Sequence, residues 1–116
     1  MSIQESFKKK FTFEKRKSEA NKMINKYPDH IPIVVESKGL IKSIDKSKFI
    51  VNNDLTVGQF IHVIRKRIKL EPTESIYVLV GNAIPMQSTT LSEVYKEHKD
   101  KDNFLYMTYC KENTFG

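Results

Sequence analysis

The side chains capable of acid, base or nucleophilic chemistry are few in this chain and lie far apart. His30, His62 and His98 are widely separated in the sequence, and no spacing typical of metal ligands surrounds them. Cys110 has no adjacent base to activate its thiol, so we expect it to pack beside the last strand. A glycine-rich phosphate loop is absent from the sequence. We therefore predict no enzyme activity, no metal site and no cofactor.

One further reactive group is the carboxylate of the terminal residue, Gly116. Glycine has no Cβ, so it offers the least bulk where a tail must enter a narrow site. Such a carboxylate suits activation by an adenylating enzyme and passage through thioesters. Because many chains end in glycine, this feature alone is weak evidence. The sequence leaves open whether Gly116 is encoded as the terminus or exposed by trimming.

Length and charge define the broad class of the protein. A chain of 116 residues fits one domain, and no apolar run approaches the ~20 residues of a membrane span. A single cysteine favours a reducing compartment. Residues 1–26 contain eight Lys or Arg against three Glu, a net +5 within a total of +6. This segment is either a basic surface for membranes, acidic partners or nucleic acid, or simply a solvated helix face.

The strongest helix signal lies in residues 54–70. Thr56 is a natural N-cap, and Gln59 three residues later completes a capping box. Leu55 and Phe60 occupy the two positions of a hydrophobic staple. Pro72 prevents much continuation. The apolar residues recur at helical spacing on one face: Val57, Phe60, Ile61, Ile64 and Ile68.

The remaining pattern predicts further helices and four strands. Ser2 begins a capping-box pattern that opens a short helix to about Lys10. The other expected elements are helices over 13–26 and from Thr90 to about His98, and strands over 30–36, 48–51, 76–80 and 104–109. Pro32 requires that one side of the first strand be unpaired there or that the strand be just beginning. The strand over 76–80 is almost wholly apolar, so we expect it to be buried on both faces.

This order predicts an α+β fold. Without the first two helices, the predicted order of elements is that of a ubiquitin-like β-grasp, in which a four-stranded mixed sheet packs on a central helix. We expect one compact domain made of a helical extension (1–26), the β-grasp core (27–110) and a flexible tail (111–116).

Several motifs resemble the ubiquitin-like autophagy modifier family, which includes the GABA-receptor-associated proteins and microtubule-associated light chain three. The resemblance covers nearly the whole chain and is nearer the GABA-receptor-associated branch. His30 and Asn52 depart from it, because the family usually has Arg and Pro there, and the loop from Ser37 to Ile44 is slightly short. The matching motifs agree in order and spacing: residues 13–19, 26–32, 54–60, 64–68, 84–85, 95–98, 104–106 and 115–116.

The resemblance implies a modifier that is joined through Gly116 to phosphatidylethanolamine. Activating and conjugating enzymes, a processing and delipidating cysteine protease, and a membrane would then be its partners. The expected setting is the cytoplasm, with autophagosome, vesicle or vacuolar membranes after lipidation. The alternative is a vesicle-trafficking adaptor that is not conjugated.

The resemblance also implies a peptide groove along the strand over 48–51, where alternate side chains face opposite sides. If that strand lies at a sheet edge, a receptor segment adds a strand beside it. The alternative interpretation is that the apolar residues along this strand serve only as core residues. An aromatic side chain of an aromatic-x-x-aliphatic motif would meet Glu19, Met23, Pro32, Lys48, Ile50 and Phe104. The aliphatic side chain would meet Phe49, Val51, Leu55, Phe60, Val63 and Arg67.

A nucleic-acid binder is a third hypothesis, based on the basic N-terminal segment. The aromatic residues are scattered over many elements and predict no stacking platform. We therefore expect no nucleic-acid partner.

Overall fold

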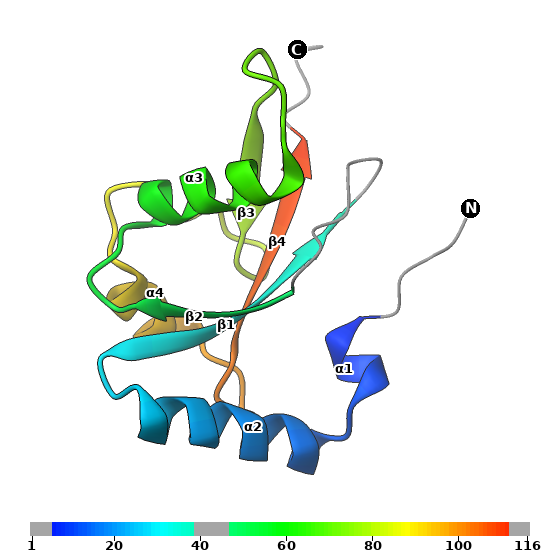
Figure 1. The fold of residues 1–116 in the computed structure, drawn as a ribbon, viewed down its shortest axis with the longest axis vertical. Helices are drawn as coiled ribbons and strands as arrows, with labels where there is room; N and C mark the ends of the chain where they lie inside the picture. Colours follow the sequence, from blue (N-terminus) through cyan, green and yellow to red (C-terminus); the bar gives the residue numbers. More distant parts are fainter. Residues whose placement is uncertain (1–5, 39–46, 112–116) are drawn as a thin grey trace.

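The computed structural model describes residues 6–38 and 47–111. Helices and strands follow one another in the order that the sequence pattern predicts (Figure 1). The elements are α1 (Phe7–Lys10), α2 (Phe13–Lys26), β1 (His30–Ser37), β2 (Lys48–Asn52), α3 (Val57–Ile68), β3 (Ile76–Leu79), α4 (Leu91–His98) and β4 (Leu105–Lys111).

The four strands form one mixed sheet in the order β2-β1-β4-β3. β1 is antiparallel to β2 and parallel to β4, and β3 is antiparallel to β4. Pro32 pairs across to Ile50 of β2, whereas pairing with β4 begins only at Ile33. The predicted exception for Pro32 is therefore confirmed, because the strand beside β1 on the β4 side starts after it.

Helices cover both faces of the sheet and enclose two hydrophobic clusters. α3 and α4 pack with the sheet around the larger cluster, which includes Ile33, Phe60, Ile64 and Leu105. α1 and α2 lie across the other face (Figure 1), where a smaller cluster joins Phe7, Ala20, Val34 and Phe104. β1 is buried from Ile31 to Val35 because it lies between β2 and β4 with helices on both sides. This arrangement confirms the predicted β-grasp sheet with two added N-terminal helices.

The predicted start of the central helix is confirmed in detail. The Thr56 side chain accepts a hydrogen bond from the Gln59 backbone N–H, and the Gln59 side chain accepts one from the Thr56 backbone. These two bonds satisfy donors that a helix N-terminus otherwise leaves unpaired. α3 ends at Ile68, with Lys69 in the left-handed region at φ 54°. β2 and α3 are thus held in a fixed relation by a short, capped connection.

The prediction that the strand over 76–80 is buried on both faces is wrong. β3 lies at the edge of the sheet, and its burial alternates. Ile76 and Val78 are buried, while Tyr77 and Leu79 are half-buried. All four side chains are apolar, so the sequence shows no alternation even though the structure does.

Two element ends also differ from the sequence prediction. The N-cap of α1 is Ser6, in an extended conformation, so the helix begins at Phe7. The predicted cap Ser2 lies outside the described residues. At the other end, β4 continues through Lys111, which pairs with Ile76 and forms an ion pair with Glu74. Lys111 was expected to begin the tail, and the sequence does not reveal these two partners on β3 and the loop before it.

Candidate functional site

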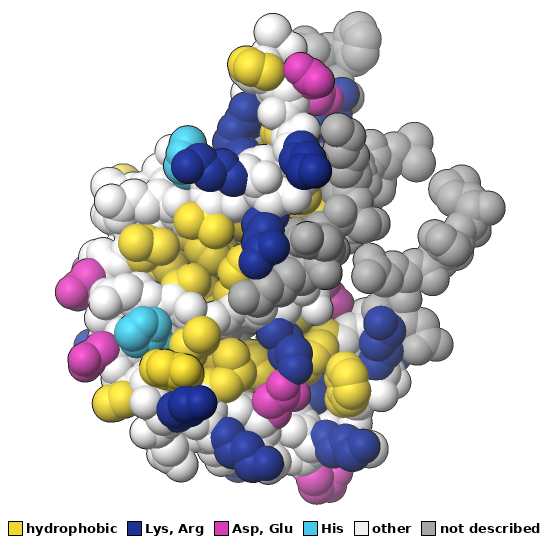
Figure 2. All heavy atoms as spheres, in the orientation of Figure 1, with side chains coloured by type: hydrophobic (Ala, Val, Ile, Leu, Met, Phe, Trp, Pro, Cys, Tyr) yellow, Lys and Arg dark blue, Asp and Glu magenta, His cyan; other side chains and the backbone are white. Residues whose placement is uncertain are grey.

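The strand β2 is the edge of the sheet opposite β3, as the site prediction requires. In the sheet formed by the described residues it has one neighbouring strand, β1. An edge strand presents a row of backbone N–H and C=O groups that can pair with another chain. Figure 2 shows hydrophobic side chains in two patches on this face, one toward α3 and one toward α2, with Lys and Arg around them.

The side of β2 that faces α3 is built on Phe49. Its ring meets the Phe60 ring edge to face, with centroids 5.5 Å apart. The Arg67 guanidinium lies 6.0 Å from the centroid of the Phe49 ring. Val51, Leu55 and Val63 are half-buried and pack against the larger cluster. The structure therefore brings together all six residues predicted to contact an aliphatic side chain.

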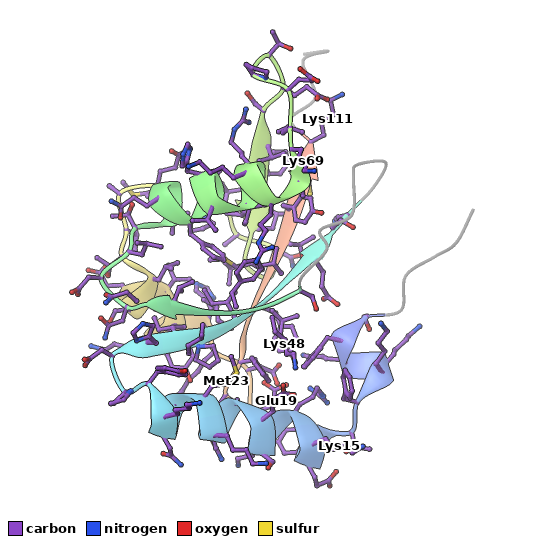
Figure 3. All side chains as sticks on the ribbon, viewed as in Figure 1. Lys15, Glu19, Met23, Lys48, Lys69 and Lys111 are labelled. Atoms are coloured by element: carbon purple, nitrogen blue, oxygen red, sulfur yellow. The ribbon has the colours of Figure 1, made fainter. Side chains whose placement is uncertain are left out.

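The side of β2 that faces α2 carries a charged pair over an apolar base. Lys48 of β2 and Glu19 of α2 form an ion pair, and Figure 3 shows Met23 beside them. Met23 packs against the smaller cluster, which includes the fully buried Phe104. Ile50 is half-buried and lies opposite Pro32 in the sheet register. The six residues predicted to meet an aromatic side chain thus lie along the border of α2 and the sheet.

The twelve predicted residues differ in how far a ligand can reach them. Pro32, Phe49, Phe60 and Phe104 are buried, so they form the base of the site and also belong to the core. Arg67 is exposed and the other seven are half-buried. The interpretation as core residues therefore applies to these four, while the other eight remain accessible to a partner. Gly116, the predicted conjugation residue, lies outside the described residues.

A buried polar junction holds α2 beside this surface, and sequence reasoning missed it. Arg16 of α2 donates to the Asp102 carboxylate over 2.6 Å, and Tyr106 of β4 donates to the same oxygen. The Asp102 side chain is fully buried. Its second carboxylate oxygen accepts from the Phe104 backbone N–H. Asp102 sits among alternating charges in a polar loop, a pattern that is typical of solvent exposure and gave no signal of burial.

The same junction shifts the pKa values of its members. Burial, followed by the hydrogen bond to Asp102, raises the pKa of Tyr106 far above its ordinary value. The hydrogen bond with Tyr106, with Asp102 as a further partner, raises the pKa of Arg16. Both groups therefore keep their protons at neutral pH. Arg16 remains a cation facing a buried carboxylate, which is the arrangement that makes a buried charge tolerable.

A second ion pair ties α1 to the same loop. Lys8 lies 2.6 Å from the Asp100 carboxylate and 4.6 Å from the Tyr106 ring centroid. Burial raises the pKa of Asp100, but hydrogen bonds from Lys8 and from the Asp102 backbone outweigh burial, so its pKa is lowered. The Phe7 backbone N–H also donates to Glu36 at the end of β1. α1 and α2 are therefore both fixed to the β-grasp core.

Comparison with known proteins identifies the family. The family model described as "Autophagy protein Atg8 ubiquitin like" matches residues 15–116. This chain belongs to the Atg8 family. It is 49% identical over 116 residues to autophagy-related protein 8 of Schizosaccharomyces pombe, covering 98% of this chain and 96% of that protein. It is 50% identical over 113 residues to autophagy-related protein 8d of Arabidopsis thaliana, covering 96% and 94%.

A solved structure agrees with the Atg8 assignment. The crystal structure of Trypanosoma brucei ATG8 matches with a TM-score of 0.90 and 40% sequence identity, covering 98% of this chain and all of that one. The chain is thus an autophagy-related ubiquitin-like protein. In its described part, none of the helices of this Atg8-family chain is long and apolar enough to cross a membrane.

Two residues that the sequence analysis expected to depart from the family pattern lie side by side. His30 and Asn52 are partners in the antiparallel register of β1 and β2. Asn52 accepts a hydrogen bond from the Asp54 backbone N–H, which shapes the turn into α3. The buried Nδ1 of His30 has no hydrogen-bond partner among the described residues. Both residues therefore lie at the end of β2 that leads into α3.

Proposed function

We propose that this Atg8-family chain is a modifier conjugated through Gly116 to phosphatidylethanolamine and acting in autophagosome formation. On the membrane it recruits receptors that carry an aromatic-x-x-aliphatic motif. Its partners are the activating and conjugating enzymes, a processing and delipidating cysteine protease, and these receptors. It is cytoplasmic before conjugation and lies on autophagosome or related membranes afterwards.

The observation that carries the receptor part is the construction of β2. This strand lies at an edge, and a different helix flanks it on each face. A peptide strand added to the edge projects alternate side chains to opposite faces. Residues three apart in that peptide therefore point to opposite faces, one toward the Lys48 and Glu19 side and one toward the Phe49 side. The spacing of an aromatic-x-x-aliphatic motif fits these two patches.

The conjugation part is supported by family membership and by the glycine at position 116. Its test is reconstitution with cognate activating and conjugating enzymes, ATP and liposomes that contain phosphatidylethanolamine. We expect the wild-type chain to yield a lipidated product that floats with the liposomes. Deleting Gly116 should abolish that product while leaving the thermal midpoint almost unchanged, because a terminal residue adds little to folding.

The matched control for this experiment is Thr114→Ala, which alters the same segment but keeps Gly116. A lipidated product from the deletion variant would refute conjugation through this glycine. A wild-type chain that binds receptor peptides but is never lipidated by competent enzymes would instead support the vesicle-trafficking adaptor.

A further inference from the structure

A cavity lies between α4 and the loop over 80–90 that leads to it, and the proposed receptor site does not use it. Its volume is about 330 Å³, within the usual range of ligand pockets. Val80 and Val94 are buried at its base, where they belong to the larger cluster. Ala83, Pro85 and Met86 extend this apolar lining along the loop. We call this cavity the α4 cavity.

The loop beside the α4 cavity is held by backbone hydrogen bonds. Val80 and Ala83 exchange two of them, over 2.9 and 3.1 Å. The Thr89 backbone N–H donates to the Met86 carbonyl over 3.1 Å. The Thr89 carbonyl accepts from the Val57 backbone N–H at the start of α3 over 2.9 Å. A cavity whose wall is fixed in this way is already shaped before a ligand arrives, so binding costs less ordering.

The carboxylates that line the α4 cavity are Glu93 and Glu97, and both are exposed. In the part of the chain that the structure describes, Glu93 forms no ion pair and Glu97 pairs with His98 alone, over 3.5 Å. Lys96 and Lys99 of the same helix line a different cavity, on the side toward α2. The whole chain has a net charge of +6, so this local negative charge favours a cationic ligand.

The two carboxylates are placed unfavourably for α4 itself. Glu93 and Glu97 are four residues apart, so they lie on the same side of the helix, where like charges repel. Glu97 is also in the last turn, where the negative end of the helix dipole disfavours a carboxylate. A cation bound beside both side chains would reduce both effects, so α4 gains stability when the cavity is filled.

Arginine matches the α4 cavity better than other cations do. A guanidinium presents a planar fork of donors that can meet two carboxylates, and it is more weakly hydrated than an ammonium group. Its aliphatic stem can cover the apolar base formed by Val80 and Val94. A metal ion is a less suitable occupant, because the described residues contain no group of three His, Cys, Asp or Glu side chains placed to hold one. Anionic lipid and nucleic acid would be repelled by the same carboxylates.

The position of the α4 cavity leaves the receptor edge free. Val80 directly follows β3, and the sheet order puts β3 at the edge opposite β2. Three strand spacings of ~4.8 Å separate these two strands by roughly 14 Å. A partner in the α4 cavity therefore does not compete with a peptide on β2.

We propose that the α4 cavity binds an arginine side chain of a partner protein, presented beside an aliphatic residue. The guanidinium meets Glu93 and Glu97, and the arginine stem covers the apolar base. The aliphatic neighbour packs on the loop at Ile84 and Met86, which are 65% and 72% exposed. This inference goes beyond the proposed function, because it requires neither a receptor motif nor conjugation, and it gives the molecule a second partner surface.

The test measures how short peptides shift the backbone amide NMR signals of the wild-type chain at low salt. One probe is the acetylated and amidated peptide Leu-Arg-Leu. The matched probe replaces its arginine by citrulline, which keeps the shape but carries no charge. We expect the arginine peptide to shift the amides of Val80, Ala83 and Val94 and to bind roughly five- to tenfold more tightly, as two exposed ion pairs can supply. Added salt should reduce this advantage.

Variants without the carboxylate charges locate the effect. Glu93→Gln/Glu97→Gln should remove the advantage of the arginine peptide. The control Glu14→Gln/Glu71→Gln neutralises two exposed carboxylates outside the cavity and should keep the advantage. Equal binding of the two peptides, an advantage that survives in Glu93→Gln/Glu97→Gln, or an equal loss in the control would overturn the proposal.

A second titration separates this site from the receptor site. In the presence of the arginine peptide, an aromatic-x-x-aliphatic peptide should bind with unchanged affinity, and competition between the two would overturn the proposal. A receptor peptide that never binds, while the arginine peptide still shifts Val80, Ala83 and Val94, would refute the receptor function and support the α4 cavity. Shifts of these amides that follow protein concentration without peptide would identify a second copy of the chain as the occupant and overturn the assignment to a partner protein.

Discussion

The two edges of the sheet differ in what lies on their faces. Among the described strands β3 pairs with β4, and its burial alternates, with Tyr77 and Leu79 half-buried. β2 has helices on both faces, because α3 packs beneath Phe49 and α2 reaches Lys48 through Glu19. Either edge can in principle pair with a backbone. The peptide recognition that we propose for β2 uses both faces of the strand and therefore needs a helix on each, and α2 supplies the one on the Lys48 side.

Loosening α2 should remove the difference between the two edges. Asp102→Asn would leave Arg16 facing a neutral amide at a fully buried position. Removing one partner of a buried pair commonly costs about 3–5 kcal/mol, because the remaining charge is left uncompensated. We expect a loss of this size in the free energy of unfolding, measured by urea denaturation. Peptide affinity should fall in the folded fraction as α2 moves away from β2.

Asp100→Asn is the matched control for this change. It removes a carboxylate from the same loop, but its partner Lys8 is half exposed to solvent. Such a pair contributes about 1 kcal/mol or less. If both substitutions cost the same, the Arg16–Asp102 pair is not what holds α2 beside the edge strand.

The buried polar junction of Arg16, Asp102 and Tyr106 also marks the limit of what the sequence predicts. The capping box at Thr56 and the apolar face of α3 are local signals, so the helix and its start could be predicted. The burial of Asp102 depends on Arg16, which lies 86 positions away in the sequence. No local pattern encodes that contact, and the surrounding Lys and Asp residues indicate a solvated loop.

The two edge strands show a related limit of prediction from the sequence. The alternation of Lys48, Phe49 and Ile50 indicated two different faces for β2, and the β-grasp order of the elements implied its edge position. In β3 an unbroken apolar run fits a central strand as well as an edge strand. Only the sheet order, which depends on long-range pairing, separates these cases.

Substitutions on β2 and β3 test the difference between the two edges through peptide binding. Ile50→Ala and Leu55→Ala should each weaken a receptor peptide by ~1–3 kcal/mol, about tenfold to a hundredfold in affinity. Phe49→Ala with Leu55→Ala should be less than additive, because both act on the aliphatic side. Tyr77→Ala on β3 should leave the affinity unchanged. Calorimetric titration of the folded variants measures all four effects.

The outcomes separate the two interpretations of β2. Undiminished affinity in Ile50→Ala, Leu55→Ala and Phe49→Ala would mean that these side chains serve only the core. Equal losses from Tyr77→Ala would mean that both edges bind the peptide or that the variants act through stability. Phe49 is buried against Phe60, so its variant needs a check of unfolding before its affinity is interpreted.

The smallest expected effect concerns the pH dependence of the α1 attachment. The pKa of Asp100 is lowered in the folded protein, so folding favours its ionised form. The stabilisation is therefore fully present above the ordinary carboxyl pKa of about 3.9 and is lost as the pH falls below it through the folded value. Because Lys8 is half exposed, solvent screening keeps this contribution below about 1 kcal/mol.

Lys8→Gln is the variant that isolates this contribution. Hydrogen bonding from Lys8 is the largest influence that lowers the pKa of Asp100, so removing the cation should bring that pKa closer to its ordinary value. We expect wild-type and Lys8→Gln unfolding free energies to differ slightly near pH 6 and to converge below pH ~3. Lys9→Gln on the same short helix is the control, and it should parallel the wild type. A difference that persists at low pH would show that Lys8 stabilises the fold mainly through the Tyr106 ring, 4.6 Å from its ammonium group, and not through Asp100.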